Sequence, residues 1–116
     1  MAAIPAENWA TRRRRLRERR HVVFQRIATG LEALQAAGVS AAVIRPVGDD
    51  QPVEILVEAT DMPAMSLAAR LLRRSMGDVA HHPVFTGDLT PERLAALRGS
   101  TWDLETVRQH QRDQAA

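Results

Sequence analysis

Apolar residues recur at helical spacing over the first third of the chain. At 100° per residue they fall within about 80° of one another, which is typical of a helix that buries one face. Asn8 is a suitable N-cap and Gly38 a suitable stop, so the pattern predicts one helix over residues 8–37. The positions that form this face are Leu16, Val23, Ile27, Leu31 and Leu34.

Two short apolar runs follow, at residues 41–45 and 53–59, and are typical of strands. Residues 46–52 between them are rich in Pro, Gly and Asp and predict a loop. We expect the two strands to pair in antiparallel fashion. In the second strand the odd-numbered residues should face one way and the even-numbered residues, including Glu54 and Glu58, the other.

The second half of the chain predicts a helix and a third strand. Asp61 and Pro63 indicate the helix start, and Gly77 indicates its end. Residues 79–85 suit a strand, in which Pro83 removes a backbone donor. Because a ladder position without a donor is tolerated at an edge, we expect this strand to be an edge strand.

Two further helices are predicted, over residues 90–98 and 101–112, the second from a capping box of Ser100 with Asp103. The order of elements is therefore α-β-β-α-β-α-α. It indicates a small α/β (α+β) fold in which helices flank a three-stranded, mostly antiparallel sheet. We expect a basic N-terminal helical arm over residues 1–20, called the basic arm below, and a single α/β domain over residues 21–113.

The densest feature is RRRRLRERR at residues 12–20, with seven Arg in nine residues. Arg13 and Arg20 fall in the apolar sector of the first helix, so its first turns cannot pack on the core as the later turns do. We therefore expect the arm to project and to bind an acidic partner, either nucleic acid phosphates or an acidic protein face. The candidate binding residues are Arg12, Arg13, Arg14, Arg15, Arg17, Arg19 and Arg20.

Composition narrows the classes further. The chain has no Cys, which excludes disulfides and thiolate metal sites and favours a reducing cytoplasm. No apolar run approaches the ~18 residues of a membrane span, so we expect no membrane partner. Two Trp, two Phe and no Tyr are too few for a surface on which bases stack. The chain has Arg but no Lys, which is typical of a protein from a GC-rich bacterial genome.

No catalytic or metal-binding set is evident, and we expect no cofactor. Glu54 and Glu58 are four residues apart, about 13 Å along a strand, so they cannot hold one ion together. His81 and His82 are adjacent and should point to opposite faces of a strand.

The large amphipathic side chains are Trp9, beside the Arg run, and Trp102, at the start of the last predicted helix. Each suits an interface anchor or a cap on the core equally well.

The segment ILVEA at residues 55–59, the helix after it and residues 77–97 resemble the minimal nucleotidyltransferase family. Its members are the small partners in bacterial toxin–antitoxin pairs with helical HEPN-type toxins. The resemblance covers about residues 31–105 and implies a nucleotidyltransferase-like fold. In that family a Gly-Ser pair after the first strand binds triphosphate, an Asp-x-Asp pair on the second strand binds magnesium, and a further Asp on a later strand assists.

The chain departs from this motif at each point. Residues 45–48 (RPVG) replace the Gly-Ser pair, and Pro52 and Glu54 stand where the two Asp residues belong. The third strand offers His82 and Val84 in place of Asp. Glu54 is thus a vestigial metal position, and a single carboxylate cannot assemble the two-metal clamp that the reaction requires.

These observations predict a non-catalytic binding or regulatory protein. Under this interpretation it is a degenerate nucleotidyltransferase-like antitoxin or partner subunit, in a hetero- or homo-oligomer, whose Arg-rich helix engages an acidic macromolecule. One alternative is a nucleic-acid-binding accessory protein with sequence-tolerant phosphate contacts. Another is an active nucleotidyltransferase with an atypical motif that depends on Glu54.

Overall fold

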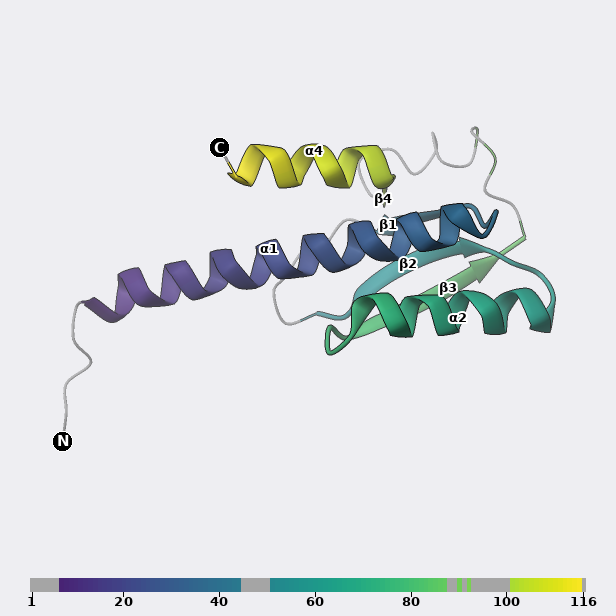
Figure 1. Cartoon of the computed structure of the whole chain (residues 1–116), viewed down its shortest axis with the longest axis horizontal. Helices are drawn as coiled ribbons and strands as arrows, with labels where there is room; N and C mark the ends of the chain where they lie inside the picture. Colours follow the sequence, from purple (N-terminus) through teal and green to yellow (C-terminus); the bar gives the residue numbers. More distant parts are fainter. Residues whose placement is uncertain (1–6, 45–50, 88–89, 91, 93–100, 116) are drawn as a thin grey trace.

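The structure is a computed structural model that describes residues 7–44, 51–87, 90, 92 and 101–115. These residues form a small α+β domain in which α1 lies between α2 and α4 (Figure 1). Side chains from all three helices bury the same face of the sheet. The elements are α1 Glu7–Ala36, β1 Ala41–Ile44, β2 Val53–Glu58, α2 Met62–Met76, β3 His81–Thr86, β4 Thr101–Trp102 and α4 Leu104–Ala115.

The strands lie in the order β3-β2-β1-β4. β1 is antiparallel to β2, as predicted, and also to β4, whereas β2 and β3 are parallel. The predicted three-stranded, mostly antiparallel sheet is therefore corrected to a four-stranded mixed sheet among the described residues. A strand pair that is joined through a helix is parallel because the chain must return to the same end of the sheet, and α2 joins β2 to β3 in this way. The edge position predicted for β3 from Pro83 is confirmed.

The last predicted helix begins later than expected. Thr101 and Trp102 form β4, which pairs with β1 at Val43 and Ile44. The carboxylate of Asp103 then accepts a hydrogen bond of 2.8 Å from the backbone N–H of Thr106, so Asp103 is the N-cap and α4 begins at Leu104. A two-residue strand is too short to show an alternating pattern. The helix predicted over residues 90–98 and the loop over residues 46–52 lie for the most part outside the described residues.

The predicted C-terminal ends of α1 and α2 are confirmed, whereas Asn8, predicted as the N-cap of α1, lies within the helix, which the structure describes from Glu7. α1 has 30 residues, about 45 Å of helix, and stops before Gly38, which has φ of 78°. At α2 the carboxylate of Asp61 accepts from the backbone N–H of Ala64 at 2.8 Å, and Gly77 with φ of 59° ends the helix. A positive φ strains residues with a side chain, so both glycines are required by the backbone.

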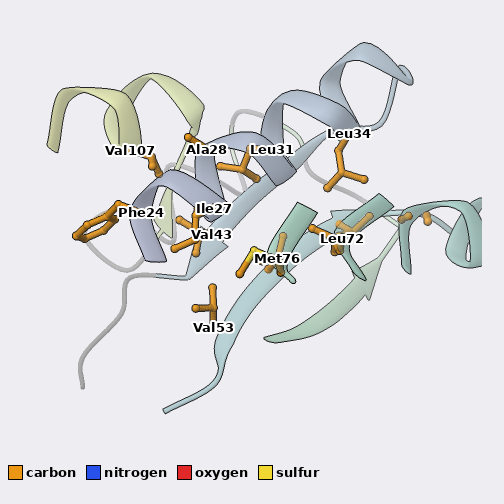
Figure 2. Close-up of a cluster of buried hydrophobic side chains, with 14 residues drawn as sticks. Phe24, Ile27, Ala28, Leu31, Leu34, Val43, Val53, Leu72, Met76 and Val107 are labelled. Atoms are coloured by element: carbon orange, nitrogen blue, oxygen red, sulfur yellow. The ribbon is translucent and has the colours of Figure 1, made fainter. Parts of the chain in front are cut away.

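The core forms where the C-terminal half of α1 packs on α2 and on the sheet (Figure 2). Gly30 allows this close approach, because a Cβ on Gly30 would lie 3.2 Å from Cδ2 of Leu72. Val53, Ile55 and Val57 are buried and Glu54 and Glu58 are exposed, as predicted, but Leu56 between the two Glu residues is also buried, so the alternation holds only in part. The largest fully buried side chains are Ile27, Leu34, Val43, Ile55, Val57, Leu72, Met76 and Val107.

Leu16 and Leu34 provide a matched test of this packing, because they lie on the same stripe of α1. Leu34 is fully buried, whereas Leu16 is 40% exposed. We expect Leu34→Ala to lower the free energy of unfolding by about 2–5 kcal/mol through lost burial and a residual cavity. Leu16→Ala should change it by less than about 1 kcal/mol. Urea unfolding followed by circular dichroism measures both changes. If the two variants lose similar free energy of unfolding, the division of α1 into a packed half and an exposed half is contradicted.

Candidate functional site

The basic arm is exposed along the whole of its described length. From Trp9 to Val22 every side chain except that of Thr11 is exposed, and burial begins at Val23 and Phe24. Figure 1 shows this half of α1 extending beyond α2 and α4, away from the domain. The structure therefore places all seven candidate arginines together on one projecting helix.

Charge in the arm is concentrated and of one sign. Several arginines in residues 12–20 are three or four residues apart. Every such pair contains either Arg15 or Arg17. Side chains at these spacings are neighbours on a helix, and like charges there destabilise it. The positive end of the α1 macrodipole also lies in the arm, so the backbone adds to the positive potential.

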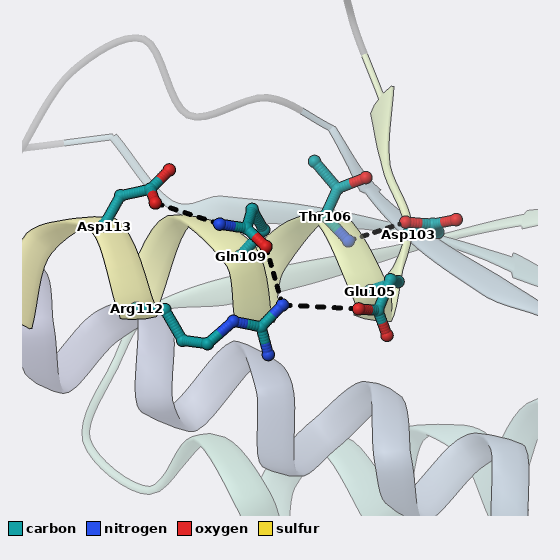
Figure 3. Close-up of polar contacts among 6 residues, drawn as sticks. All are labelled: Asp103, Glu105, Thr106, Gln109, Arg112 and Asp113. Carbon is teal, nitrogen blue, oxygen red and sulfur yellow. Dashed lines mark hydrogen bonds and ion pairs between the residues drawn. The ribbon is translucent and has the colours of Figure 1, made fainter.

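Two arginines of α4, in contrast, have partners within the chain. Arg108 forms an ion pair of 2.8 Å with Glu32. Arg112 lies 3.4 Å from Glu105 and donates a hydrogen bond of 2.7 Å to the side chain of Gln109 (Figure 3). Among the described residues, no carboxylate forms an ion pair with the six arginines of residues 12–19.

Arg26 marks the boundary between arm and domain. Its guanidinium lies against the C-terminal end of α2, where Nη1 is 2.6 Å from the position that a Cβ on Gly77 would take. A cation beside the carbonyl end of a helix is favourable. Arg26 is therefore part of the domain packing, unlike the arginines that precede it.

The two Trp residues, for which the sequence left both roles open, occupy different environments. Trp9 is 66% exposed, and the guanidinium of Arg13 lies 5.8 Å from its ring centroid. Trp102 is half-buried and stacks on His110 at 4.0 Å and on Phe24 at 5.8 Å between ring centroids. Sequence analysis missed this stack because its members are far apart in the chain. Trp102 is thus occupied within the domain, whereas Trp9 is available on the arm.

The carboxylates and histidines that the sequence offers as possible metal ligands lie on the sheet. Glu54 and Glu58 are exposed on β2, and the cross-strand neighbour of Glu54 is the exposed His82. His81 faces the other way, with Nδ1 2.9 Å from the carbonyl oxygen of Val79, so the predicted opposite orientation of the two His residues is confirmed. In the part of the chain that the structure describes, no three His, Asp or Glu side chains gather as a metal site would require.

A pocket of about 580 Å³ lies between the C-terminal end of α1, the start of β1 and the first turns of α4. Its charged side chains already have roles: Asp103 caps α4, Glu105 pairs with Arg112, and Arg108 pairs with Glu32. The pocket therefore presents no unused set of charged groups, and the arm is the stronger candidate site.

Comparison of the chain with protein-family models, with curated proteins and with solved structures finds no match. The nucleotidyltransferase resemblance therefore stays a prediction. Among the helices that the structure describes, none has the length and apolar content to cross a membrane.

Like-charge repulsion in the arm predicts a salt-dependent helix. We expect ellipticity at 222 nm to become more negative as salt is raised, because screening weakens the repulsion between neighbouring arginines. The variant Arg15→Gln/Arg17→Gln removes every such pair in residues 12–20 and should show a smaller salt response. The control Arg73→Gln/Arg74→Gln removes the same charge from α2. Because the buried side chains Ala68, Leu72 and Met76 hold that helix in the core, this variant should respond as the wild type does. An unchanged response in the arm variant would contradict this account of the arm.

Proposed function

We propose that this protein is a non-catalytic binding protein that engages a polyanionic macromolecule through the basic arm. The observation that carries the proposal is that the arm arginines are exposed on a helix that projects from the domain. Three arginines of the domain, Arg26, Arg108 and Arg112, are instead packed or paired within the chain. The six arginines of residues 12–19 form no ion pair with a described carboxylate, and such a set of like charges is stabilised by an external anion.

Arginine suits this role chemically. Its planar guanidinium donates two parallel hydrogen bonds to a phosphate or carboxylate, and it stays charged at every physiological pH. When the anion is a nucleic acid, each neutralised phosphate also releases condensed counterions, which adds affinity that falls steeply with salt. Seven arginines in nine residues would make such binding strong at low salt and independent of base sequence.

The proposal predicts salt-dependent binding that resides in the arm. Fluorescence anisotropy with labelled DNA and RNA across a salt series should give a linear decrease of log K with log salt. The variant Arg13→Gln/Arg14→Gln/Arg17→Gln should lose affinity and flatten this slope by up to about three. Arg70→Gln/Arg73→Gln/Arg74→Gln removes the same charge from exposed positions on α2 and should bind as the wild type does.

If the two triple variants lose equal affinity for nucleic acid, a specific role for the arm is contradicted. The binding would then depend only on the net charge of the protein. If the protein does not bind nucleic acid at low salt, the second candidate is favoured, in which the arm binds a protein partner.

A protein partner is favoured by one observation. Trp9 and Leu16 continue the stripe of α1 that is buried at Ile27, yet both are exposed, at 66% and 40%. An acidic surface with an apolar centre would cover them, and Trp and Arg are the residues most enriched at interface hot spots. This arrangement suits the degenerate nucleotidyltransferase-like antitoxin, whose complex with its partner would partly survive moderate salt through apolar contacts.

An active nucleotidyltransferase is the third candidate, and it makes a separate prediction. Transfer of labelled nucleotide from a triphosphate with magnesium should be undetectable, because Glu54 has a His rather than a second carboxylate as its neighbour on β3. Transfer that is abolished by Glu54→Gln and retained by Glu58→Gln would contradict the proposed function.

A further inference from the structure

We infer that the polyanion is duplex DNA and that the basic arm occupies its major groove. This inference rests on the proposed function and depends on how the arginines are distributed around the helix axis. Because residues 7–36 form one continuous α-helix, the direction of each side chain follows from 100° of rotation per residue.

The arginines surround most of the helix. With Arg12 set at 0°, Arg15 and Arg19 lie at about 300° and 340°, and Arg13 and Arg17 lie at about 100° and 140°. Including Arg14 and Arg20, the seven cover an arc of about 260°. A flat surface reaches less than half of a cylinder that lies on it, so a flat partner would leave several of these charges without a counter-ion. An arc this wide fits an anion that encloses the helix on three sides.

The remaining sector has the opposite character. Thr11, Glu18 and Val22 lie between about 240° and 280°, and Glu18 is the one carboxylate in residues 12–20. Trp9 and Leu16 lie at about 60° and 40°, nearly opposite that sector. The arm therefore has an apolar ridge with arginines on both flanks, and a back that carries the negative charge. Glu18 on the back would point away from an enclosing polyanion, where it opposes binding least.

The dimensions of the arm agree with a B-form major groove. An α-helix with its side chains is about 10–12 Å across, and the groove is about 12 Å wide and bounded by a phosphate backbone on each side. The exposed stretch from Trp9 to Val22 is about 20 Å long, which lets the helix enter the groove while the domain stays outside. The apolar ridge would then face the floor of the groove, where thymine methyl groups accept apolar contacts.

Other polyanions fit less well. The major groove of A-form RNA is too deep and narrow for side chains to read, so a helix is not admitted there. Single strands are bound on rows of aromatic residues, whereas Trp9 is the single aromatic side chain among the described residues of the arm. An acidic protein face would meet the ridge and its nearer flanks but would leave Arg14 and Arg15 unpaired.

Binding preference tests the inference. Fluorescence anisotropy with the full chain should use four probes: a 20-bp DNA duplex, one of its single strands, the equivalent RNA duplex and poly-glutamate. We expect the DNA duplex to bind at least about tenfold more tightly than the other three at equal salt. The two flank variants Arg12→Gln/Arg19→Gln and Arg13→Gln/Arg17→Gln should lose comparable affinity, since each flank faces one backbone.

Dimethyl sulfate footprinting locates the groove, because it methylates guanine N7, which lies in the major groove. The wild type should protect guanines within the duplex, and Arg13→Gln/Arg14→Gln/Arg17→Gln should not. Duplex binding without protection of N7 would overturn the inference.

Equal affinity for all four probes, or preference for single-stranded DNA or duplex RNA, would also overturn it while leaving polyanion binding intact. Binding to poly-glutamate alone would overturn it in favour of an acidic protein partner. If the protein binds none of the four probes, both the inference and the proposed function are contradicted.

Discussion

Burial of one half of α1 is the constraint on which the rest of the structure depends. Ile27, Leu31 and Leu34 lie in the core formed by α1, its neighbours α2 and α4, and the sheet. They anchor one end of a helix that is about 45 Å long. The close contact at Gly30 and the guanidinium of Arg26 against Gly77 fix this half to α2. Because the anchored half is rigidly packed, the other half extends from the domain as a continuous helix rather than as a loose tail.

Electrostatics explains why the unanchored half does not fold back. Burying a guanidinium in an apolar core is costly, and Arg13 and Arg20 lie on the side of α1 that would face the core. The domain uses its own carboxylates elsewhere: Glu32 and Glu105 pair with arginines of α4, and Asp61 and Asp103 cap helices. No described carboxylate forms an ion pair with the six arginines of residues 12–19, which is why we assign the arm an external anion.

Much of the fold was predictable from local pattern. Helix ends at Gly38 and Gly77, the cap at Asp61 and the edge position of the strand with Pro83 all follow from backbone chemistry that acts within a few residues. Projection of the arm was also predictable, since charges at core-facing positions of an amphipathic helix forbid packing. The Arg cluster was evident as a candidate site for the same reason.

Non-local features were not predictable. β4 has two residues and exists because Trp102 pairs with Val43 and stacks on Phe24 and His110, contacts that join three distant parts of the chain. Parallel pairing of β2 and β3 depends on how α2 crosses the sheet, which alternation within a strand does not report. The different environments of Trp9 and Trp102 likewise required the tertiary structure, because both residues adjoin helical segments in the sequence.

The central claim is that the exposed arm, and not the domain, meets the polyanion. Fluorescence of single-Trp variants measures this most directly, because Trp9 reports on the arm and Trp102 on the domain. Titration of the Trp102→Phe variant with duplex DNA should change the emission of Trp9 and saturate at a fixed stoichiometry. The same titration of the Trp9→Phe variant should leave the emission of Trp102 nearly constant. A response from Trp102 alone, or from neither residue while binding occurs, would contradict the account.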